Sequence, residues 1–209
     1  MPSLQWNGPK SAEWTLVLAH GAGAGMDSPF MRYVAEAISK QGVRVGRFNF
    51  PYMVRAVEEG RRRPPDAMNK LLIAWEDVVR NVGSPLEAGQ KLAIGGKSMG
   101  GRIASMSTHL EYVGALICLG YPFHPPGKPE KLRTDHLVDI KVPAMIIQGE
   151  RDTFGNQDEV KRMNLPSQIK KVWLADGDHS FKPRKKSGRT LEQNMDLAVE
   201  SLVAFLRSC

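Results

Sequence analysis

Three residue types that together activate a hydroxyl nucleophile occur in this sequence in one particular order. Ser98 lies in the pentapeptide GKSMG (96–100), which follows an apolar run and precedes a helix-like stretch. A serine hydroxyl attacks a carbonyl carbon when a histidine accepts its proton and a carboxylate orients that histidine. Asp152 and His179 each come just after a later apolar run. The order therefore predicts Ser98 as nucleophile, Asp152 as orienting acid and His179 as general base.

Such a nucleophile also needs two backbone N–H groups that bind the negative oxygen formed during attack. We expect one from Met99, the residue after the serine, and the other from Ala22, in the glycine-rich segment HGAG (20–23) that follows the first apolar run. His20, just before Ala22, either braces this turn through a hydrogen bond or is a packing residue.

The tripeptide Gly-Lys-Ser at 96–98 also resembles the end of a phosphate-binding P-loop. That loop requires a glycine five positions before Gly96, where this chain has Lys91. A dinucleotide-binding reading of the segment 21–26 fails similarly, because its third glycine position holds Met26 and no acidic residue ends the next strand. We therefore expect no nucleotide cofactor, and no cofactor of another kind.

Other residues compete for the same roles with weaker placement. Asp139 and Asp158 could replace Asp152, but neither follows a strand as directly, and Asp178 is interpreted as a turn residue. Three further histidines follow no strand closely, namely His109, His124 and His136. No group of His, Cys and Asp residues has the spacing of metal ligands, so no metal site is expected.

Three residues near these motifs have two interpretations each. Lys97 could attract a substrate anion, or its side chain could lie in packing or solvent. Tyr52 and Met53 follow a strand and could line the substrate pocket, or they could belong to a loop that packs on the core.

The elements that must position these residues follow from hydrophobic periodicity. Apolar runs predict strands, and patterns with helical spacing between them predict helices. A proline-rich loop is expected over 51–65. Continuous apolar strands that alternate with helices predict an α/β fold, a mostly parallel sheet with helices on both faces. The predicted strands are 15–23, 43–50, 91–96, 113–123, 142–152 and 169–181, and the predicted helices are 27–40, 66–82, one from Ser98, and 191–206.

Composition restricts the class of protein. The 209 residues suit one domain, 1–209, with 42% hydrophobic and 24% charged residues. The N-terminus has no signal-peptide pattern, no apolar run is long enough to cross a membrane, and Cys118 and Cys209 are too few for a disulfide framework. We therefore expect a reduced, cytoplasmic protein that does not bind membranes, with no prediction of its oligomeric state.

Part of the net charge of +7 lies in two short basic runs, 61–63 and 182–186. Solvated loops are their ordinary explanation, and attraction of an anionic substrate is the alternative. No nucleic-acid motif and no interleaved aromatic residues accompany the runs. We therefore expect a small-molecule substrate and no nucleic-acid partner.

At the motifs around Ser98, Asp152, His179 and the turn 20–23, the sequence resembles the α/β-hydrolase family over about residues 15–206. It is most similar to short members without a cap, related to dienelactone hydrolase, although Ser98 stands where that enzyme has cysteine. The segment RFNFPYM (47–53) is similar to a branch related to testis-expressed and acetyltransferase-complex hydrolase-like proteins. The resemblance implies an α/β-hydrolase fold with reduced N-terminal strands, and the short segment 122–141 leaves no room for a cap domain.

The resulting hypothesis is a carboxylesterase-like serine hydrolase that acts on an ester or thioester through an acyl-enzyme. Two alternatives remain open. Some relatives in the resembled branch are scaffolds, which would make this chain a binding module of little activity. A peptidase or amidase would use the same three side chains.

Overall fold

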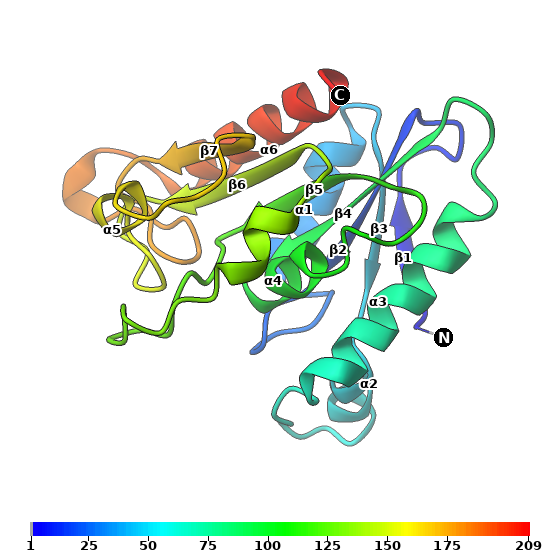
Figure 1. Ribbon diagram of the computed structural model, residues 1–209, viewed down its shortest axis with the longest axis horizontal. Helices are drawn as coiled ribbons and strands as arrows, with labels where there is room; N and C mark the ends of the chain where they lie inside the picture. Colours follow the sequence, from blue (N-terminus) through cyan, green and yellow to red (C-terminus); the bar gives the residue numbers. More distant parts are fainter. Residues whose placement is uncertain (1) are drawn as a thin grey trace.

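The computed structural model describes residues 2–209 as one seven-stranded sheet with helices packed against it (Figure 1). The strands are β1 Leu4–Asn7, β2 Trp14–Ala19, β3 Arg44–Phe48, β4 Lys91–Lys97, β5 Val113–Leu119, β6 Ala144–Gly149 and β7 Ile169–Leu174. The helices are α1 Pro29–Ser39, α2 Pro51–Glu58, α3 Met68–Gly83, α4 Met99–Ser105, α5 Gln157–Lys161 and α6 Leu191–Arg207, with 3₁₀ turns at η1 Asp135–Asp139 and η2 Lys185–Ser187.

The sheet is parallel except at one edge. Its strand order is β1-β3-β2-β4-β5-β6-β7, and β1 alone runs antiparallel to its neighbour, β3. The parallel pairing of β2 with β4 ends at Ala19 opposite Gly96. The turn that starts at His20 therefore emerges beside the turn that carries Ser98, because parallel strands end at the same edge of a sheet.

Helices cover both faces of this sheet, as the sequence predicts. One apolar layer contains α1 and α6, and the other contains α2, α3 and α4 (Figure 1). Side chains of β2 alternate between the two layers, with Leu16 and Leu18 on the α1 side and Val17 and Ala19 on the α3 side. Burial on both faces explains why the strands are continuous apolar runs rather than alternating ones.

One predicted loop is wrong, because residues 51–58 form the helix α2. Pro51 occupies the first turn of that helix, where a proline costs no backbone hydrogen bond. Tyr52 and Met53 are buried on its inner side. Pro51 thus directly follows the predicted strand 43–50 and at the same time starts a helix. Strands β2, β3, β5, β6 and β7 are also shorter than the predicted ranges, which extended into the turns that follow them.

The connection from β5 to β6 is short, as expected for a fold without a cap. It contains only the turn η1 and packs Leu137 and Ile140 against the core. Within residues 2–209, no helix is both long and apolar enough to cross a membrane.

Candidate active site

Ser98 lies on a sharp turn between β4 and α4. Its backbone has φ 51° and ψ −116°, a conformation that residues other than glycine rarely adopt. Gly96 and Gly100 make this turn possible, since a Cβ atom on either residue would collide with the carbonyl oxygen of Ala19. The glycines thus allow the turn of Ser98 to pack directly on the end of β2, and the serine side chain is only partly buried.

The three residues predicted to act together form one chain of hydrogen bonds. Ser98 Oγ lies 2.8 Å from His179 Nε2, and His179 Nδ1 lies 2.7 Å from Asp152 Oδ2. The Asp152 side chain is fully buried, whereas the His179 side chain is 22% exposed. In this arrangement the imidazole can accept the serine proton at Nε2, while Asp152 keeps the other ring proton on Nδ1.

Two residues that the sequence analysis missed hold Asp152 and His179. Gln148, on β6, donates from Nε2 to Asp152 Oδ2 at 2.8 Å, and the backbone N–H of Phe154 donates to Oδ1 at 2.8 Å. The carboxylate is therefore fixed by donors at both of its oxygens. The Phe154 ring also packs on the imidazole of His179, with ring centroids 4.2 Å apart. The position of Phe154 two residues after Asp152 was the available signal for its role.

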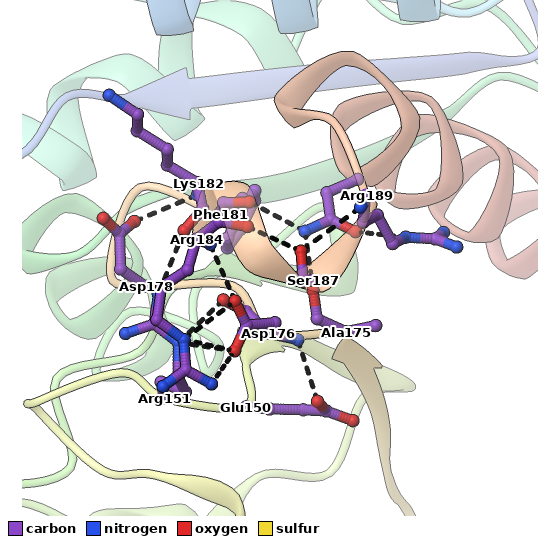
Figure 2. Close-up of polar contacts among 11 residues, drawn as sticks. Glu150, Arg151, Ala175, Asp176, Asp178, Phe181, Lys182, Arg184, Ser187 and Arg189 are labelled. Atoms are coloured by element: carbon purple, nitrogen blue, oxygen red, sulfur yellow. Dashed lines mark hydrogen bonds and ion pairs between the residues drawn. The ribbon is translucent and has the colours of Figure 1, made fainter.

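The loop that carries His179 is tied to the turn that carries Asp152 by a polar cluster around Asp176 (Figure 2). Arg151 Nε donates to the carbonyl oxygen of Asp176 at 2.9 Å, and the N–H of Asp176 donates to Glu150 Oε2 at 2.8 Å. The Asp176 carboxylate accepts from Arg184, on the far side of the loop. The hydrogen bond from Arg184 lowers the pKa of Asp176 to about 2, so this carboxylate is charged at neutral pH.

Asn194, on α6, holds the same loop from inside the protein. Its side chain is fully buried, and its Nδ2 donates to the carbonyl oxygens of Ala175 at 3.1 Å and Phe181 at 2.8 Å, on either side of His179. Arg189 Nε donates to its Oδ1 at 2.8 Å. No sequence motif indicated Asn194, which meets the loop only through the packing of α6.

Lys97 has a structural role that its position before Ser98 did not reveal. Its Nζ donates to the backbone carbonyl oxygen of His179 at 2.6 Å and lies 5.5 Å from the centroid of the Phe30 ring. Burial lowers the pKa of Lys97 to about 8, although the charges of Asp152 and Asp178 oppose this shift. The side chain thus connects the end of β4 to the backbone of the histidine.

His20 and Tyr52 fix the turn that contains Ala22. The N–H of Phe50 donates to His20 Nε2 at 3.1 Å, which leaves the ring proton on Nδ1, and this proton is donated to the Gly21 carbonyl oxygen at 2.6 Å. Burial lowers the pKa of His20 to about 4, so the ring is neutral, although the hydrogen bond to Gly21 opposes this shift. The Tyr52 hydroxyl lies 3.2 Å from the Ala22 oxygen and 3.4 Å from the Gly21 oxygen.

These contacts determine the direction of a backbone donor. The C=O and N–H groups of one trans peptide point in opposite directions. Because the carbonyl of Gly21 points toward the His20 ring, the N–H of Ala22 points away from it. The N–H of Met99, at the first position of α4, likewise has no partner within its helix.

A cavity of about 370 Å³ opens over Ser98 and His179. The turn 21–24, the first turn of α1 and Phe154 line it, with the aromatic ring of Phe30 among its walls. Tyr52 does not line this cavity, so of its two interpretations the pocket role is wrong and packing on the core is confirmed: the side chain is buried behind the turn. Met53 lines a neighbouring cavity that shares Ala22 and Gly23 with this one.

The other candidate residues lie outside this arrangement. His124 contacts Glu159, and His136 contacts Ser105 at 2.8 Å, but Ser105 donates its own proton to the Arg102 carbonyl. Asp178 accepts from the N–H groups of Ser180 and Lys182, as a turn residue does, whereas Asp139 ends η1 and Asp158 lies on α5. Over residues 2–209, no three His, Cys, Asp or Glu side chains are grouped as metal ligands would be.

A separate cavity of about 460 Å³ lies between α2 and α3. Val54, Ile73 and Asp77 are among the residues that line it, and it has no serine, cysteine or histidine in its walls. It therefore has no group of the serine–histidine type, whereas the cavity at Ser98 contains both a hydroxyl and an imidazole within hydrogen-bond distance of each other.

Comparison with known proteins places this fold. The alpha/beta hydrolase domain family matches residues 12–207. Among solved structures, an alpha-beta serine hydrolase homologue from Coxiella burnetii has 22% identity and a TM-score of 0.68, with 95% of this chain and 90% of that chain covered. Dienelactone hydrolase from Anabaena variabilis has 22% identity and a TM-score of 0.66, with coverage of 94% and 88%. A serine hydrolase without a lid from Xanthomonas campestris has 20% identity and a TM-score of 0.63, with coverage of 95% and 88%. Since the family match spans nearly the whole chain, this protein belongs to the α/β-hydrolase family.

Proposed function

We propose that this protein is a serine hydrolase that cleaves an ester or thioester of a small or medium acyl group. The observation that carries the proposal is the chain from Ser98 Oγ through His179 to Asp152, with contacts of 2.8 and 2.7 Å. Because Ser98 lies on a strained strand-to-helix turn, its hydroxyl oxygen is exposed to a substrate carbonyl. The aromatic walls and the volume of about 370 Å³ at Ser98 suit an apolar acyl group of modest size.

In the first half of the reaction, Ser98 Oγ attacks the carbonyl carbon while His179 Nε2 takes the hydroxyl proton. The resulting imidazolium is stabilised by Asp152, which accepts from Nδ1. The tetrahedral intermediate then collapses, its bond to the leaving oxygen or sulfur breaks, and His179 returns the proton to the leaving group. Ser98 is left as an acyl ester.

During both halves, the N–H groups of Met99 and Ala22 are the proposed donors to the carbonyl oxygen as it becomes negative. Two observations support this role, the free first position of α4 and the outward direction of the Ala22 N–H. In the second half, water attacks the acyl carbon, His179 Nε2 takes the proton from that water, and Ser98 regains it as the acid leaves.

A fluorophosphonate probe tests the nucleophile directly. We expect one covalent adduct on Ser98, located by peptide mass spectrometry, and no adduct in Ser98→Ala or in unfolded protein. Turnover of p-nitrophenyl acetate should be lost in Ser98→Ala. Unchanged turnover in that variant would disprove the assigned nucleophile.

A matched panel of p-nitrophenyl esters, thioesters and anilides then defines the reaction class. We expect the esters and thioesters to be cleaved and the anilides to be poor substrates. Preferential cleavage of the anilides would favour an amidase. A folded protein without adduct or turnover would favour a binding module.

A further inference from the structure

A second cavity adjoins the one at Ser98, on the other side of the turn 20–23. Its volume is about 530 Å³, and both cavities are lined by Ala22 and Gly23. Since Ala22 carries a proposed donor to the reacting carbonyl, a substrate held there can extend one arm into each cavity.

The walls of this second cavity are apolar on one side and cationic on the other. Met53, Ala56 and Val57 of α2 form the apolar side. Three consecutive arginines, Arg61–Arg63, line the remainder, and none of the lining residues is acidic. The helix that the sequence analysis did not expect therefore brings the basic run 61–63 close to the site.

The charges of these arginines are only partly neutralised. Glu59, which is not among the lining residues, accepts from Arg61 Nε at 2.7 Å and from Arg63 Nε at 2.9 Å. These two contacts, that of Arg63 above all, lower the pKa of Glu59. Nearby, Arg55 and Asp66 neutralise each other at 2.6 Å. Arg62 has no acidic partner among residues 2–209, so its guanidinium remains available.

We propose that this cavity binds an anionic group of the substrate, so that the preferred ester carries a carboxylate or similar anion beyond an apolar spacer. The inference rests on the proposed serine hydrolase function. Met53, Ala56 and Val57 contact the spacer, and Arg62 pairs with the anion while Arg61 and Arg63 add to the positive potential. A guanidinium suits this role because it stays charged and presents two parallel N–H groups to a carboxylate.

Pairs of esters that differ only in one charge test the proposal. One pair carries the charge on the acyl arm, mono-p-nitrophenyl adipate against its methyl-capped diester. The other carries it on the leaving group, 4-butyryloxybenzoate against its methyl ester. We expect kcat/KM to favour the anion in at least one pair, and Arg62→Gln to reduce that preference by about five- to tenfold at low salt, less at high salt.

Two further variants make the test specific. Lys10→Gln removes one positive charge near the start of β4, at the opposite end of the parallel strands from Ser98, and should leave the preference for the anion unchanged. Glu59→Gln frees Arg61 and Arg63 and should increase the preference. Equal anion-to-neutral ratios in wild type and Arg62→Gln, for both pairs, would overturn the proposal.

Failure of the proposed function can be distinguished from failure of this inference. If wild type cleaves the neutral esters and reacts with the fluorophosphonate, the proposed function holds, and the anion-to-neutral ratios of kcat/KM then test the anion-binding cavity alone. If it does neither, binding of adipate to Ser98→Ala protein is measured by calorimetry. Binding that Arg62→Gln weakens and Lys10→Gln does not would support the cavity, and equal affinity in all three proteins would reject it.

Discussion

Lys97 and His179 are joined by a 2.6 Å hydrogen bond from the lysine ammonium to the histidine's backbone carbonyl oxygen. Because Lys97 directly precedes Ser98, the same strand end positions the proposed nucleophile and restrains the loop of the proposed base. This contact lowers the stability of the fold, because the Lys97 ammonium loses contact with water where it lies near Phe30 and Phe181.

Replacing Lys97 with methionine should stabilise the fold and slow the reaction. Removing the desolvated charge should raise the free energy of unfolding at pH 7 by roughly 1–3 kcal/mol. Between pH 8, the approximate pKa of Lys97 in the folded protein, and its ordinary pKa of 10.5, folded wild type binds fewer protons than unfolded wild type. The stability of wild type therefore rises with pH in this range, and the difference in unfolding free energy between Lys97→Met and wild type becomes smaller.

Urea unfolding at several pH values, together with kcat on a neutral ester, measures both effects. Lys91→Met serves as the control, because Lys91 lies exposed at the other end of β4 and pairs with Glu13. Loss of stability in Lys97→Met without a change in kcat would contradict this account of Lys97.

Ser98→Gly should be more stable than Ser98→Ala, although both lose turnover. The positive φ of 51° strains alanine but not glycine, a difference of about 1 kcal/mol. Thermal unfolding of the two variants compares them directly. At Ser201, within α6, the order should be reversed: Ser201→Gly should be less stable than Ser201→Ala, because glycine destabilises a helix interior.

His20 should make the fold sensitive to mild acid. Its pKa is about 4 when folded and 6.5 ordinarily, so the unfolded chain binds the extra proton between these values. Stability is fully present above pH 6.5 and should fall by roughly 3 kcal/mol as the pH drops to 4. Urea midpoints at pH 7, 5.5 and 4.5 test this, and His20→Gln should show a shallower decline. Identical slopes in the two proteins would refute the assignment.

Asn194→Ala should disturb the histidine loop from a distance. The variant leaves the carbonyl oxygens of Ala175 and Phe181 without the hydrogen bonds from Asn194 Nδ2, which should lower the free energy of unfolding by about 1–3 kcal/mol. We also expect a lower rate of fluorophosphonate labelling at Ser98, since the loop then holds His179 less firmly. Asn164→Ala, at an exposed loop position, is the matched control for both measurements.

The predictable part of the site lies at strand ends. Ser98, Asp152 and His179 could be located because each follows an apolar run, and parallel strands end at one edge of the sheet. The supporting residues Gln148 and Asn194 could not, because their roles depend on which loop the fold places against them. The choice between the two interpretations of Tyr52 could not be made for a related reason: the sequence places the residue after a strand but does not show that its side chain packs into the core.

The short β5–β6 connection also bears on the fate of the proposed acyl-enzyme. Within residues 2–209 this connection forms no cap over Ser98, and the His179 side chain is 22% exposed, so bulk water reaches the imidazole from the same side as any other nucleophile that could accept the acyl group. An alcohol or amine can therefore compete only through its own concentration and nucleophilicity. We accordingly expect hydrolysis to dominate over acyl transfer.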